Sequence, residues 1–392
     1  MSSANSSYTV APSYSPEPGN NERRLDQAPH PKSRVFSGHR TKKSGRDTVV
    51  LIAHYEHADV PTYGPSALID GSVNLEDRES VSKVAFEIKG TIEFMAGEST
   101  VTKTIFAEHR ILWSMEHSEG ATCPSTLPFA THLPAQFEYN QATYPLPPSY
   151  FVSSDGGVYA KIVYSLAVTV SRSRGRKLAF LSAKNTISIP FAYSPRTRPP
   201  GPPTVPPANF PVNPMSTSEQ FHVLTLTARP RPRVSLHPVD VQLFTSTADV
   251  FPLGAPIPVH IQLTGPPDSL REFLPGAAGA PPRSRVEVRL LRQTTMLVEG
   301  HKETCRTTLG TAALVPSGGA QDAWDGELRC DGGVGSFEAG LVGVQDFIVL
   351  EVLDAAGPKS QFGRARQPRA ICLVADPWQD DVNSLSDTRG SH

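Results

Sequence analysis

The sequence predicts an all-β protein made of two tandem β-sandwich domains, and three observations lead to this expectation. Apolar and polar residues alternate over many short segments, which is the pattern of half-buried strands. The 38 Pro and 29 Gly residues separate these segments, and hardly any stretch has a helical period. A chain of 392 residues is also long enough for two domains of ordinary size.

Residues 1–46 are expected to be a disordered basic tail. They are rich in Ser, Asn and Pro, nearly free of aliphatic residues, and carry eight basic against three acidic side chains. The tail contains no apolar stretch typical of a secretory signal peptide, and no run in the chain is apolar for long enough to span a membrane. The sequence therefore predicts a cytoplasmic protein.

Residues 47–194 are expected to form the first sandwich. Every second residue from Val84 to Phe94 is apolar, apart from one glycine, and the same alternation recurs from Ile162 to Val170. Because such strands bury only one face, they indicate an antiparallel sheet packed against a second layer.

Four cations follow the second of these strands. Arg172, Arg174, Arg176 and Lys177 surround a glycine and precede another apolar stretch, so the spacing predicts a hairpin turn. The cations of such a turn could bind phosphoryl groups or an anionic membrane surface. A solvated turn without a partner is the alternative, and we favour it.

Residues 195–218 are expected to be a Pro-rich linker between the domains. Nine of its first twenty residues are Pro, which excludes a continuous sheet and favours a semi-rigid polyproline connection. Within it, Arg196, Pro199 and Pro202 match the Arg-x-x-Pro-x-x-Pro pattern that SH3 domains bind. Pro-rich linkers produce such matches by chance, so we favour a plain hinge.

Residues 219–376 are expected to form the second sandwich, and residues 377–392 an acidic tail. Alternation recurs from Ile257 to Leu263 and from Val286 to Leu290. The continuous apolar run Phe347–Leu350 predicts a strand that is buried on both faces.

Composition and motifs argue against several classes of function. The 37 basic and 38 acidic residues nearly cancel, so no nucleic-acid partner is expected. The four Cys lack the spacing of a metal site, and no motif for a nucleophile, a phosphate loop or acid/base catalysis is found. We therefore expect a protein that is not an enzyme and needs neither a metal nor a cofactor.

One segment matches a known peptide ligand. Pro147, Pro148 and Tyr150 form a Pro-Pro-x-Tyr motif, which WW domains bind when it is exposed. The segment lies between predicted strands, where its prolines would begin a strand and Tyr150 would pack inside the sandwich, and we favour this structural role. The segment Ala11-Pro12-Ser13-Tyr14 lacks the first proline but lies in the tail, as a degenerate version of the same ligand.

Several segments of the first half have a characteristic order and spacing: Pro61-Thr62-Tyr63-Gly64-Pro65, Ile69–Leu75, Leu127-Pro128-Phe129, Leu146–Tyr150 and Ile189-Pro190-Phe191. Together they resemble the N-terminal domain of arrestins, and the second half is similar to the C-terminal arrestin domain in outline. The resemblance implies two immunoglobulin-like β-sandwich domains, the arrestin fold, without an active site. It also implies a cytosolic adaptor of the fungal α-arrestin type.

Such adaptors bind cytosolic segments of membrane receptors or transporters at the plasma membrane or endosomes. They recruit WW-domain ubiquitin ligases of the HECT type, so that the bound protein is ubiquitinated and internalised. Two other functions stay open. A structural subunit of a retromer-like vesicle-sorting complex would co-purify with large partners in a fixed ratio. A β-sandwich carbohydrate-binding or hydrolytic protein would have a pocket with converging ionisable groups.

Overall fold

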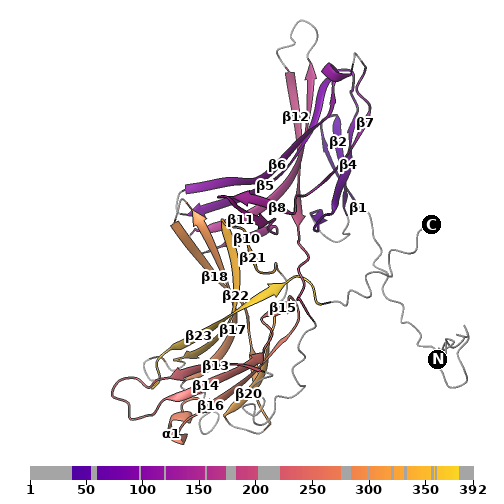
Figure 1. Ribbon diagram of the computed structural model, residues 1–392. Coiled ribbons are helices and arrows are strands. Elements are labelled where there is room, and N and C mark those ends of the chain that lie inside the picture. Colours follow the sequence, from indigo (N-terminus) through magenta and orange to yellow (C-terminus); the bar gives the residue numbers. More distant parts are fainter. Residues whose placement is uncertain are drawn as a thin grey trace, which may run out of the picture. The chain divides into compact units, whose positions relative to one another are not determined.

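The computed structural model describes residues 38–53, 60–96, 99–118, 121–154, 157–173, 182–201, 221–274, 284–298, 301–318, 322–330, 333–354, 357 and 360–378. Within these ranges nearly all regular structure is β-strand, so the expected all-β class is confirmed (Figure 1). The helical segments among them are one turn each, η1 (Met115–His117) and α1 (Pro267–Leu270).

Two larger sheets and a hairpin are built from residues 38–193, which we call the N-terminal half together with residues 194–201. The first sheet has the order β1-β2-β4-β7, with β1 (Gly38–Ser44), β2 (Asp47–Ala53), β4 (Leu68–Leu75) and β7 (Thr126–His132). The second has the order β3-β12-β11-β5-β6, with β3 (Thr62–Tyr63), β12 (Ser182–Tyr193), β11 (Tyr159–Ser173), β5 (Val81–Ala96) and β6 (Ser99–Ser114). Strand β10 (Tyr150–Ser153) pairs with β11, and the hairpin consists of β8 (Gln136–Tyr139) and β9 (Ala142–Pro145).

The expected boundary of the disordered tail at residue 46 is wrong for residues 38–46, because they form β1 and its turn into β2. Strand β1 lies at the edge of its sheet, where few apolar side chains are needed. Its cations are engaged instead: the Lys42 Nζ donates to the Ser188 carbonyl over 2.7 Å, and Lys43 forms an ion pair with Glu76. The low apolar and high basic content of this segment predicted a disordered tail, although the segment forms an edge strand.

Two further sheets are built from residues 221–374, which we call the C-terminal half together with residues 375–378. The five-stranded sheet has the order β13-β14-β16-β20-β19, with β13 (Phe221–Ala228), β14 (Val239–Ser246), β16 (Ile257–Thr264), β20 (Ala323–Leu328) and β19 (Ala313–Pro316). The six-stranded sheet has β15 (Val250–Pro252), β23 (Ala365–Val374), β22 (Val342–Leu353), β17 (Arg285–Val298) and β18 (His301–Thr311) in that order, with β21 (Phe337–Glu338) paired to β22.

The strands expected from alternation lie where the pattern places them. Strand β5 contains Val84–Phe94, and the apolar residues of that run are buried. The run Phe347–Leu350 lies in β22, where Ile348, Val349 and Leu350 are buried, as expected for a strand covered on both faces. The expected linker falls between β12 and β13, and residues 202–220 and 379–392 lie outside the described residues.

Side chains from facing sheets enclose two hydrophobic cores, which confirms the β-sandwich character. One core lies mainly between the N-terminal sheets and the other between the C-terminal sheets. The six-stranded sheet of the C-terminal half contributes to both. On β17, Leu290 belongs to the C-terminal core and Met296 to the N-terminal one, and on β22 the same holds for Ile348 and Val342.

A buried ion pair separates the two apolar parts of this sheet face. Arg292 on β17 lies opposite Asp346 on β22, and its Nε and Nη2 donate to the two Asp346 carboxylate oxygens over 2.8 and 3.0 Å. Ser336 Oγ also donates to Asp346, and Arg292 Nη2 donates to the Val334 carbonyl. Burial would lower the pKa of Arg292, but Asp346 outweighs it and raises that pKa above its ordinary value. The pair is thus satisfied without water.

Candidate partner-binding surface

The Pro-Pro-x-Tyr segment is packed inside the protein. Pro147 and Pro148 are buried, and the Tyr164 hydroxyl donates to the Pro147 carbonyl. The Tyr150 hydroxyl lies 2.7 Å from Thr294 Oγ1, and its ring meets Phe337 edge-on with the centroids 5.5 Å apart. Burial raises the pKa of Tyr150, although the Thr294 hydrogen bond opposes the shift. This arrangement contradicts the WW-ligand interpretation and supports the structural role.

The SH3-type candidate is partly engaged by Asp376, which follows the last strand, β23. Arg196 Nε lies 3.3 Å from Asp376 Oδ2, and the Thr197 carbonyl accepts from the Asp376 backbone N–H. Pro199 is half-buried, and Pro202 lies outside the described residues. An SH3 domain would have to compete with Asp376 for the Arg196 charge, and the SH3 interpretation stays a prediction.

The predicted basic turn falls largely outside the described residues, which include Arg172 but not Arg174, Arg176 or Lys177. Arg172 donates with both terminal nitrogens to the carboxylate of Asp47, which Asn185 also reaches over 2.8 Å. The Asp47 side chain is fully buried. The structure argues against both interpretations of Arg172, as a ligand for a phosphoryl group or lipid and as part of a solvated turn, because the Asp47 carboxylate neutralises its charge within the protein.

Acidification should weaken the contact between Arg172 and Asp47. Burial would raise the pKa of Asp47, but the hydrogen bonds from Arg172 and Asn185 outweigh it and lower that pKa below its ordinary value. A carboxyl with a lowered pKa stabilises the fold above its unfolded pKa, about 3.9 for Asp, and this stability is lost as pH falls through the folded value.

We expect Asp47→Asn to lower the free energy of unfolding by about 2 kcal/mol at pH 7 and to flatten its decline below about pH 4. Urea unfolding at a series of pH values between 2 and 7 measures both effects. Glu327→Gln, which removes one charge of an exposed pair with Arg329, is the control. Equal acid dependence in the Asp47→Asn variant and the wild type would contradict the assignment.

A different charged surface lies on the outer side of the six-stranded C-terminal sheet. Arg285, Glu287 and Arg289 point outward from alternate positions of β17, and Glu351 on β22 and Arg366 on β23 continue the row across the sheet. We call these five residues the arginine face. Ion pairs connect all of them.

The carboxylates of the arginine face lie beneath its guanidinium groups. The side chains of Glu287 and Glu351 are 11% and 14% exposed, whereas those of Arg285 and Arg366 are 62% and 39% exposed. The hydrogen bond from Arg289 to Glu287 raises the pKa of Arg289, so its charge is permanent. The surface therefore presents cations to solvent above a layer of anions.

The carboxylates also orient the arginines. Arg285 Nε lies 3.1 Å from Glu287 Oε1, and Arg366 Nε lies 3.4 Å from Glu351 Oε1. At the same end of the sheet Arg364 Nε donates to Asp354 over 2.6 Å. No hydrogen bond among the described residues uses the terminal nitrogens of these three arginines. The Nε of Arg285 and of Arg366 is thus ion-paired, and that of Arg364 is hydrogen-bonded. The terminal nitrogens of each guanidinium can donate two hydrogen bonds to a planar anion.

No three His, Cys, Asp or Glu side chains of the described residues are grouped so that they could hold a metal ion. Neither described helix has the length and apolar character needed to cross a bilayer. No protein-family model and no curated protein matches this sequence.

Sequence reasoning identified only part of the arginine face. The outward position of Arg285, Glu287 and Arg289 follows from the alternation with Val286 and Val288. Glu351 and Arg366 join them through strand pairing, and the register of β17, β22 and β23 is not encoded in any one segment.

Proposed function

We propose that this protein is a non-enzymatic, arrestin-like adaptor that binds acidic cytosolic segments of membrane proteins. The observation that carries the proposal is the arginine face, with oriented and exposed guanidinium groups above nearly buried carboxylates. The two sandwich cores and the strand content are compatible with the tandem arrestin domains that the sequence resembles.

A peptide fits this surface better than a membrane or a nucleic acid. Arg285, Arg289 and Arg366 of the arginine face are offset by Glu287 and Glu351, so its net charge is only three minus two, or +1. Attraction to an anionic membrane scales with net charge, at about 1 kcal/mol per cation near the surface. Recognition of single carboxylates depends instead on bidentate hydrogen bonds from guanidinium groups, which the arginine face can donate.

The link to endocytosis is part of the proposal. In an adaptor of this kind the bound receptor or transporter is brought to a ubiquitin ligase and internalised. Because Pro147, Pro148 and Tyr150 are packed inside, a WW-domain ligase would need another segment. The degenerate segment Ala11–Tyr14 is the remaining candidate, and it lies outside the described residues.

Charge reversal tests the proposed function. We expect the double variant Arg285→Glu/Arg366→Glu to bind a fluorescein-labelled twelve-residue peptide of alternating Glu and Ser at least about tenfold more weakly than the wild type, because it places like charges opposite each other, which costs up to several kcal/mol. Fluorescence anisotropy at two salt concentrations measures the affinity. The control Arg329→Glu reverses an exposed arginine that pairs with Glu327 outside the face.

Equal affinity of the double variant and the wild type would contradict the proposal. Phosphatidylserine vesicles give a second test. If the wild-type protein sediments with them and the double variant does not, while neither binds the peptide, the face serves a membrane instead.

A further inference from the structure

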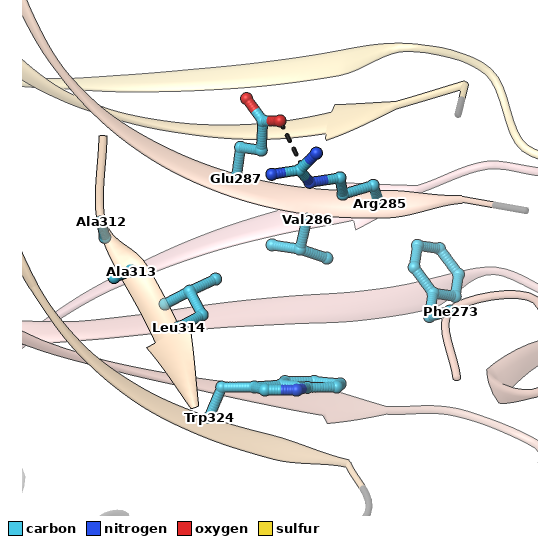
Figure 2. Close-up of a pocket in the computed structure, with 8 residues that line it drawn as sticks. All are labelled: Phe273, Arg285, Val286, Glu287, Ala312, Ala313, Leu314 and Trp324. Carbon is cyan, nitrogen blue, oxygen red and sulfur yellow. Dashed lines mark ion pairs between the residues drawn. The ribbon is translucent and has the colours of Figure 1, made fainter. Parts of the chain in front are cut away.

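An opening in the side of the C-terminal sandwich lies directly below the arginine face (Figure 2). Its volume is about 280 Å³. It is lined by Phe273, Val286, Leu314 and Trp324, together with Arg285, Glu287, Ala312 and Ala313. Figure 2 shows the paired Arg285 and Glu287 on one side of β17, and Val286 pointing the other way, toward Leu314 and Trp324.

The opening exists because β17 begins before its neighbour can pair with it. Strand β18 pairs with β17 only as far as Arg289, which lies opposite Thr311. After Thr311 the chain leaves this sheet and joins the opposite one as β19, where Pro316 lies opposite Trp324. The two sheets are therefore not closed against each other beside Arg285–Glu287.

The backbone of β17 faces the opening at Val286. Ala312 N donates to the Val288 carbonyl over 2.9 Å, so the Val288 backbone groups point away from β22. In a strand the groups two residues away point to the same side, which places the N–H and C=O of Val286 at the opening. No strand in the described part of the chain pairs with β17 on this side before Arg289. An unpaired strand edge of this kind can receive an extended peptide.

We infer that the opening receives one aromatic side chain of the same acidic segment, which adds as a short strand beside Val286. The inference rests on the proposed function and specifies the partner's chemistry. A cavity of about 150 Å³ holds benzene, so this one has room for a Phe or Tyr side chain. The rings of Phe273 and Trp324 offer edge-to-face contacts to it.

Strand geometry determines the neighbours of this aromatic residue. Side chains alternate between the two faces, so the residues before and after it point outward, toward the arginine face. One of them lies beside Arg285 and the other beside Glu287. Opposite charges across a strand pair attract and like charges repel. The segment therefore has an acidic residue on the Arg285 side of its aromatic residue and a non-acidic one on the Glu287 side.

Selection from a random twelve-residue peptide library displayed on phage tests the inference, with the full chain as bait. We expect the enriched peptides to contain an aromatic residue next to a single Asp or Glu. A synthetic peptide with the enriched sequence should bind Leu314→Trp, which fills the opening, at least tenfold more weakly than the wild type. The Arg285→Glu variant should bind the same peptide more weakly. Its affinity should be restored for a peptide in which Lys replaces the acidic residue. This second readout is independent of the fold of Leu314→Trp.

Three results would overturn the inference. One is a library that yields no enriched sequence. Another is equal affinity of the enriched peptide for the wild type and for Leu314→Trp. If Arg285→Glu/Arg366→Glu still weakens binding in that case, the proposed function stays intact. The third is binding that appears only when residues 275–283 are replaced by Gly and Ser, which would assign the opening to that segment of the chain. If the double charge reversal has no effect on binding, the proposed function fails and this inference fails with it.

Discussion

Replacing Asp346 by Ala is expected to lower the free energy of unfolding by about 3–5 kcal/mol. The substitution leaves the Arg292 guanidinium buried without its counter-ion, and Ser336 loses its acceptor as well. An uncompensated buried charge is among the most destabilising defects that a single substitution creates. Urea-induced unfolding followed by intrinsic fluorescence measures the loss.

The matched control removes an exposed pair. Glu327→Ala breaks the ion pair with Arg329, and it should cost less than about 1 kcal/mol. The double variant Arg292→Met/Asp346→Leu should recover much of the loss, because it removes both charges and keeps the volume. If Asp346→Ala were no more destabilising than Glu327→Ala, the buried pair of Arg292 and Asp346 would not stabilise the fold.

Replacing Tyr150 by Ala is expected to cost about 3 kcal/mol, the second largest effect. The substitution removes the ring that packs against Phe337 and the hydroxyl that bonds Thr294, and both partners belong to the C-terminal half. A shift of the urea midpoint, together with the melting temperature, measures the change.

Tyr150→Phe is the conservative comparison. It keeps the ring and removes one hydrogen bond, so the expected cost is about 1 kcal/mol. A Phe variant with unchanged stability that loses binding to a WW domain would restore the peptide-ligand interpretation of this segment and remove the structural one.

The elements that could be predicted from the sequence are those that local pattern determines. Apolar and polar residues alternate from Val84 to Phe94 because one face of β5 packs against the core. This pattern can be recognised within eleven consecutive residues. Strand β1 escaped prediction because it lies at a sheet edge and satisfies its lysines with partners from distant strands, such as Ser188.

Candidate sites were harder to predict because the same residues can serve opposite purposes. The sequence Pro-Pro-Ser-Tyr can be an exposed peptide ligand or the buried beginning of a strand, and only its burial distinguishes the two roles. Arg172 was recognised as a cation, but its partner Asp47 lies 125 residues away in the chain. The arginine face likewise depends on strand register, which decides that Glu287 lies opposite Glu351.

The six-stranded C-terminal sheet, which contributes side chains to both cores, affects how the protein folds during its synthesis. The ribosome completes residues 38–193 first, yet Met296 and Val342, which cover part of the core of that half, emerge more than one hundred residues later. Translation proceeds at about 5–20 residues per second, so this hydrophobic surface of the nascent chain stays exposed for several seconds or more. Chaperones that act during translation should therefore hold this polypeptide until β22 has left the exit tunnel.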